Sequence, residues 1–165
     1  MKKFDVAQTI SILSNFGVLV GIVLLVFELN QGRQMMRAQT RTEIAQGAIT
    51  ALNLRGTNSE VRSLWERASS EEGLPESERL QFSLLVSAVF RYHENVHYQY
   101  RLGLYDEAEF DAQRMAWREI YNRRGPAIIW CSTRHTFSPD FVAEIENDVM
   151  TAFDCDELLR TLGPQ

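Results

Sequence analysis

The chain has 165 residues, and its 17 basic and 22 acidic side chains give a formal net charge of −5. This balance excludes the strongly basic surface that is typical of nucleic-acid-binding proteins, so we expect no nucleic-acid partner. The two cysteines, Cys131 and Cys155, have neither CxxC spacing nor the density of a disulfide framework. We therefore expect two free thiols in a reducing compartment, with a pairing of the two cysteines as the alternative.

The N-terminal segment 6–27, VAQTISILSNFGVLVGIVLLVF, contains no charged side chain and is bracketed by Asp5 and Glu28. A helix rises about 1.5 Å per residue, so this segment reaches roughly 33 Å and would cross the hydrocarbon core of a bilayer. Lys2 and Lys3 resemble the start of a secretory signal peptide, but the apolar run is too long and no small-residue cleavage site follows. We expect a single transmembrane helix rather than a signal peptide or a buried core helix.

Two faces of this span are candidates for helix association. Gly17 and Gly21 form a GxxxG pair, with Ser14 one turn earlier, and this spacing lets helices approach closely in lipid. A second face begins with polar residues and continues with apolar ones. In a symmetric oligomer it would line a pore with a hydrophobic constriction; otherwise its polar members lie at the interface or hydrogen-bond between helices. This face consists of Gln8, Ser11, Asn15, Val18, Ile22 and Val26.

The helical pattern continues from Glu28 to Leu54 and predicts a stalk beyond the membrane. Apolar and small residues recur there at alternating spacings of three and four, as in a coiled coil, and would pack on the domain or on a second copy. Arg33, Arg37 and Arg41 follow the span, where we expect contact with anionic headgroups; a vestibule that concentrates anions is the alternative. The seam consists of Met35, Ala38, Thr42, Ala45, Ile49 and Leu52.

Caps, glycines and prolines divide the rest of the chain into short helices, and no stretch alternates with the period of a strand. We expect Gly103 and Gly125 to end two of these helices. The longest carries two apolar stripes, which is typical of a helix packed on both sides. The expected helices cover about 60–69, 75–102, a segment from Asp106, 127–135 and a segment from Ser138.

The sequence therefore predicts an all-α chain in which one N-terminal transmembrane helix continues into a stalk helix and then a small helical-bundle domain. We expect the tail and transmembrane helix at 1–30, the stalk at 31–56 and the soluble domain at 57–165.

His93, Glu94 and His97 form the motif H-E-x-x-H on the longest predicted helix. Histidines four residues apart can hold zinc, and the glutamate can act as general base on a metal-bound water. Both histidines, however, fall on an apolar stripe, Arg91 brings a charge close to them, and only Glu119 stands near the position of a third ligand. We expect no metal, no cofactor and no enzymatic activity, with a zinc metalloprotease as an alternative.

Arg91, Glu94, Tyr98 and Arg101 share another face of this helix. Buried, they would form a polar network that fixes the register of the helix; exposed, they would form a solvated stripe. A small anionic ligand held by Arg91, Arg101 and Arg134 is the third interpretation.

Four segments carry a family resemblance: LNQGRQMMRAQT, SEVRSLWERA, ESERLQFSLLVSAVFRYHENVHYQYRLGLYD and RGPAIIWCSTRHTFSPDF. The chain resembles a large family of uncharacterised bacterial single-span membrane proteins, which implies a small helical cytoplasmic domain but no activity. In that family the position of Glu94 is usually glutamate, whereas those of His93 and His97 are often aromatic or other residues. The resemblance thus weighs against the metalloprotease. Lys2 and Lys3 depart from the family pattern.

These features lead us to expect a membrane-anchored helical protein without enzymatic activity that self-associates, in its most specific form as a homo-oligomeric pore or channel-like assembly. The alternative is a sensor that binds a small anionic ligand through its cytoplasmic domain. We expect a single-pass location in the bacterial inner (cytoplasmic) membrane, with the bilayer and further copies as partners. Basic residues nearly balance across the span, so the free thiols and short tail place the domain in the cytoplasm.

Overall fold

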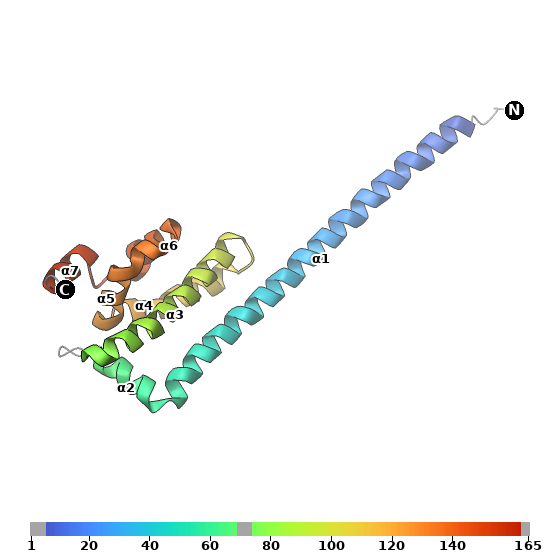
Figure 1. Ribbon diagram of the computed structural model, residues 1–165. Coiled ribbons are helices and arrows are strands. Elements are labelled where there is room, and N and C mark those ends of the chain that lie inside the picture. The colour runs from blue at the N-terminus through green and yellow to red at the C-terminus, as the bar shows by residue number, and fades with distance from the viewer. Residues whose placement is uncertain (1–5, 69–73, 163–165) are drawn as a thin grey trace. The chain divides into compact units, whose positions relative to one another are not determined.

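The computed structural model describes residues 6–68 and 74–162, with side chains placed for 10–68 and 74–161 (Figure 1). Throughout that part of the chain every regular element is a helix, and no strand occurs, which confirms the all-α prediction. The chain divides into two compact units, residues 1–39 and residues 40–165.

The elements follow one another with short connections. They are the helices α1 (Val6–Thr57), α2 (Ser59–Ala68), α3 (Glu76–Arg101), α4 (Glu107–Tyr121), α5 (Arg124–Thr133), α6 (Pro139–Glu144) and α7 (Cys155–Leu162), with a 3₁₀ turn η1 (Arg134–Thr136) and a π turn η2 (Ile145–Val149).

The first unit is the N-terminal part of α1. Every side chain described between residues 10 and 39 is exposed. Among the described elements, α1 is the helix long and apolar enough to cross a membrane, and none of its most apolar window is buried within the structure.

The second unit begins inside α1 and therefore includes residues that we expected in a separate stalk. Thr40 and Ile44 are buried, with exposed fractions of 7% and 2%. The predicted seam faces elsewhere, since Ile49 and Leu52 are 50% and 61% exposed. This part of α1 thus packs on the domain through a different stripe from the one that apolar spacing indicates.

Small residues explain which stripe of α1 faces the domain. A Cβ atom added to Gly47 would lie 2.6 Å from the Tyr92 ring, so the two helices approach closely here. The Tyr92 hydroxyl donates a hydrogen bond of 2.7 Å to the carbonyl oxygen of Ile44. The glycine that weakens the isolated helix by about 1 kcal/mol therefore provides the contact surface for α3.

The core of the second unit is built from aromatic side chains. Phe90 of α3 stacks on Tyr121 of α4 with ring centroids 4.6 Å apart, and it meets Trp130 of α5 edge-on at 5.4 Å. All three are fully buried. Aromatic pairs of this geometry contribute about 0.5–1.5 kcal/mol beyond the area they bury, so they fix α3, α4 and α5 to one another.

Side-chain caps begin two of the helices where the sequence indicates. The Asn58 side-chain oxygen accepts from the backbone N–H groups of Glu60 and Val61 at 3.0 and 3.1 Å. Asp106 accepts from the backbone N–H of Ala108 at 2.9 Å. Asp106 also accepts from the backbone N–H of Glu109 at 3.4 Å, while the Glu109 carboxylate pairs with Arg41 at 2.7 Å.

The two glycines expected to end helices differ in role. Gly103 follows α3 with a φ of 68°, the left-handed conformation that favours glycine. Gly125, in contrast, lies in the first turn of α5, and a Cβ atom there would lie 2.4 Å from the backbone oxygen of Ala68. The expectation that Gly125 ends a helix is therefore wrong. The residue lies inside α5, where the lack of a side chain allows α5 to approach α2 closely.

Cys131 of α5 and Cys155 of α7 form a disulfide with Cα atoms 5.1 Å apart, although 24 positions separate them in sequence. The prediction of two free thiols is wrong. The cysteines meet because α7 packs on α5 after the chain has passed through α6 and η2. The spacing of the cysteines in the sequence does not reveal this packing. The thiol argument for a cytoplasmic domain therefore no longer applies.

Candidate functional site

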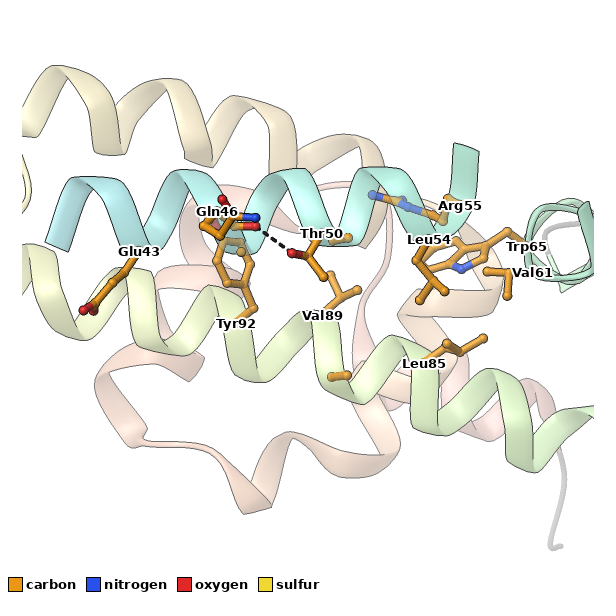
Figure 2. Close-up of a pocket in the computed structure, with 13 residues that line it drawn as sticks. Glu43, Gln46, Thr50, Leu54, Arg55, Val61, Trp65, Leu85, Val89 and Tyr92 are labelled. Carbon is orange, nitrogen blue, oxygen red and sulfur yellow. Dashed lines mark hydrogen bonds between the residues drawn. The ribbon is translucent and has the colours of Figure 1, made fainter. Parts of the chain in front are cut away.

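The second unit contains a groove between the C-terminal part of α1 and helices α2 and α3. Figure 2 shows side chains from the three helices around a space of about 520 Å³. We call this space the apolar groove, since most of its walls are aliphatic or aromatic. Its lining includes Leu54, Val61, Trp65, Leu85 and Val89.

Tyr92 defines the geometry at one side of the apolar groove. Its hydroxyl is tied to Ile44 of α1 while its ring lies against Gly47. Burial raises the pKa of Tyr92 to about 12, so the hydroxyl keeps its proton at neutral pH and acts as a donor. The residue therefore sets the spacing of α1 and α3 rather than serving as an acid or base.

A second, smaller cavity of about 290 Å³ lies between α1, α3 and α4. We call it the basic cavity, because the guanidinium side chains of Arg55 and Arg123 line it. It shares part of its wall with the apolar groove, so the two spaces adjoin. The shared residues are Ala51, Arg55, Trp65, Val89 and Tyr92.

Arg55 stands at the junction of the two spaces. Its guanidinium lies 5.0 Å from the centre of the Trp65 ring, a cation–π contact. Burial, and then the nearby charge of Arg123, lowers the pKa of Arg55. In the described part of the chain, neither Arg55 nor Arg123 has a carboxylate within ion-pairing distance. The positive charge at the junction is therefore not neutralised by an ion pair with any described carboxylate.

His93 and Trp117 both belong to the lining of the basic cavity. Their rings stack at 4.5 Å. The buried Nδ1 of His93 and Nε1 of Trp117 have no hydrogen-bond partner among the described residues. Burial lowers the pKa of His93 to about 3, so this side chain is neutral at physiological pH. These two side chains therefore add no charge to the cavity lining, and the two ring nitrogens are buried within the fold.

The H-E-x-x-H residues contact different parts of the fold. His93 and His97 enter the aromatic core, where His97 lies 5.6 Å from Phe141. Glu94 pairs with Arg91 at 2.7 Å. Across the described residues no group of three potential ligands from His, Cys, Asp and Glu comes together.

Glu94 and Arg91 link α3 to the turn before α6. The backbone N–H of Ser138 donates to the Glu94 carboxylate at 2.8 Å, and Arg91 donates to the carbonyl oxygen of Thr136 at 3.0 Å. The Arg91 guanidinium also lies 4.0 Å from the centre of the Phe137 ring. This pair therefore positions the segment 136–138.

The other residues of the predicted anion site make contacts of their own, separate from those of Arg91 and Glu94 with the segment 136–138. Arg101 pairs with Asp140, and Arg134 pairs with Glu146 at 2.9 Å and with Asp156 at 3.1 Å. Tyr98 is 55% exposed. The three arginines proposed from sequence each have a carboxylate partner, whereas Arg55 and Arg123 have none among residues 6–68 and 74–162.

The residues predicted from sequence to act in membrane association lie on the exposed first part of α1. A Cβ atom added at Gly17 or Gly21 would have no described neighbour within 4 Å. The side chain of Gln8 lies outside the described residues. Ser14 and the remaining members of the predicted pore face are all exposed: Ser11, Asn15, Val18, Ile22 and Val26.

Sequence reasoning did not single out Arg55 or Arg123, because neither belongs to a motif. One signal was present for Arg55: it follows Ala48 and Ala51 at helical spacing and so shares their face of α1. Arg123 reaches the cavity from the short connection between α4 and α5, and only the packing of α4 on α3 brings it there.

No protein-family model matches the chain, and no curated protein or solved structure is significantly similar to it. The resemblance to bacterial single-span membrane proteins therefore stays a prediction.

Proposed function

We propose that this protein is a membrane-anchored sensor without enzymatic activity, in which the apolar part of α1 spans a bilayer and the second unit binds a small molecule. One observation carries the proposal: the apolar groove is walled by the last turns of α1 itself. A ligand in the groove would contact the same helix that carries the span. If the ligand binds one conformation of α1 more tightly than another, binding would raise the population of the tighter-binding conformation. The size of the shift is set by the difference between the two affinities.

The dimensions and chemistry of the groove support a small-molecule site. Its volume of about 520 Å³ lies within the roughly 300–1,000 Å³ that is usual for ligand pockets. Its walls are mainly apolar, with Arg55 and Thr50 among the few polar side chains. Such sites commonly combine an apolar lining with a few polar groups that orient the ligand.

The contacts of the H-E-x-x-H residues support the absence of catalysis as part of the proposal. Glu94 is held by Arg91 and by the backbone of Ser138, while His93 stacks on Trp117. These contacts account for all three motif residues as parts of the fold, because His97 packs against Phe141.

The test uses the full chain in lipid nanodiscs and a photoreactive decanol, an uncharged amphiphile. Illumination should label peptides from 43–55 and 85–92 when the products are mapped by mass spectrometry. Ala88→Trp, at the groove wall, should abolish this labelling. Ala112→Trp, at another exposed helical position that lines neither cavity, should leave it unchanged. Labelling that is absent, or equal in the two variants, would refute the proposal.

Self-association is a second candidate, and the exposed seam favours it. Ile49 and Leu52 are at least half exposed, so the packing of α1 on its own domain leaves much of both side chains uncovered. In this proposal the seam meets that of another copy, Gly17 and Gly21 pack in lipid, and a pore is the most specific form. The particle mass in nanodiscs tests it: several copies are expected, and a monomer at all protein concentrations would exclude it.

A further inference from the structure

The apolar groove and the basic cavity meet at Arg55, and this junction indicates what kind of molecule fits them together. Both spaces are lined by Ala51, Trp65 and Val89 as well as by Arg55. The two spaces therefore adjoin at these side chains, one with a mainly apolar lining and the other with two guanidinium groups.

The charges around the basic cavity favour an anionic polar part. Arg55 and Arg123 contribute two positive charges and Glu119 one negative charge, while His93 is neutral. Arg123 is held in place, since its Nε donates to the backbone oxygen of Glu119 at 3.0 Å. The two guanidinium groups repel each other across a partly buried space, and an anion between them would relieve this repulsion.

The groove that leads away from the junction is suited to a hydrocarbon chain. Leu54, Leu85 and Val89 line it on both sides, between α1 and α3 (Figure 2). Glu43 lies at the far end of the groove from Arg55 in that view. An anionic headgroup would therefore favour the Arg55 end, and the ligand would enter with a defined direction.

We propose that the two spaces bind one single-chain amphipathic carboxylate, of the fatty-acid class, with its headgroup between Arg55 and Arg123 and its chain in the apolar groove. This inference rests on the proposed function and specifies its ligand. Guanidinium groups suit the headgroup, because their planar donors match the two oxygens of a carboxylate.

The experiment compares three photoreactive probes of equal chain length on the full chain in zwitterionic nanodiscs: decanoate, decanol and decylamine. Measurements are made at mildly alkaline pH, where the carboxylic acid is ionised. Decanoate should label 43–55 and 85–92 at a concentration roughly tenfold lower than decanol requires. A tenfold difference is the effect expected of one charge-assisted hydrogen bond. Decylamine should label least. Unlabelled decanoate should compete.

Matched arginine variants test the headgroup position. Arg55→Gln and Arg123→Gln should each remove most of the preference for decanoate over decanol, whereas Arg79→Gln, an exposed change that lines neither space, should retain it. Arg123 is exposed, so its variant keeps the test valid if Arg55→Gln fails to fold. Equal labelling by decanoate and decanol, or a preference that survives both variants, would overturn the inference and leave the proposed function standing. Labelling by none of the probes would overturn both.

Discussion

Glu94 shows how one residue of an apparent catalytic motif can serve the fold. Its carboxylate accepts a hydrogen bond from the Ser138 backbone and pairs with Arg91. Burial alone would raise the pKa of Glu94, but these hydrogen bonds lower it below the usual 4.5. The ionised carboxylate is therefore more stable in the folded chain than in the unfolded chain.

Glu94→Gln should lower the free energy of unfolding by about 0.5–1.5 kcal/mol, because the exposed Ser138 N–H and the Arg91 guanidinium both lose a charged acceptor. The folded-state pKa lies below the unfolded value, so this contribution is complete above the unfolded pKa. It is lost as the pH falls through the folded pKa. Urea titrations of the full chain by circular dichroism should show the gap between wild type and variant closing in acid. Glu66→Gln, at an exposed position, is the control, and a gap independent of pH would contradict the assignment.

At the scale of elements, the sequence predicts the helices better than the faces they present. Asn58 and Asp106 cap helices as their residue types indicate, because a cap depends only on neighbouring backbone groups. The packed face of α1 depends on a distant partner. Gly47 faces Tyr92, and a periodicity that counts apolar side chains gives no weight to a glycine. Arg55 escaped prediction for the same reason, since its role arises from Trp65 and Arg123.

Gly125→Ala tests the contact between α5 and α2. The new methyl group would meet the Ala68 backbone oxygen at 2.4 Å, and a backbone atom cannot rotate away. We expect a loss of about 1–3 kcal/mol in the free energy of unfolding, the usual cost of overpacking. Gly56→Ala is the matched control, since its Cβ would enter open space within α1, and it should be neutral or stabilising by up to about 1 kcal/mol. Equal effects of the two changes, measured by urea denaturation, would show that α5 and α2 can separate at little cost.

At the scale of the whole molecule, the disulfide changes the argument about orientation. Lys2 and Lys3 precede the segment that we propose as a span, while Arg33, Arg37 and Arg41 follow it, so counting basic residues does not decide the direction of insertion. Disulfides persist mainly in oxidising compartments. Sequence spacing could not reveal this bond, because Cys131 and Cys155 meet only through the packing of α7 on α5.

We therefore predict that the second unit faces the oxidising side of its membrane rather than the cytoplasm. A C-terminal alkaline phosphatase fusion should be active and a green fluorescent protein fusion dark, because each folds productively on only one side. In the full chain, both Cys131 and Cys155 should react with a maleimide polymer only after denaturation and reduction, whereas in a cytoplasmic domain they should react after denaturation alone. A fluorescent fusion together with thiols that need no reduction would place the domain in the cytoplasm. The anionic ligand would then be sought among cytoplasmic metabolites rather than among molecules that reach the cell from outside.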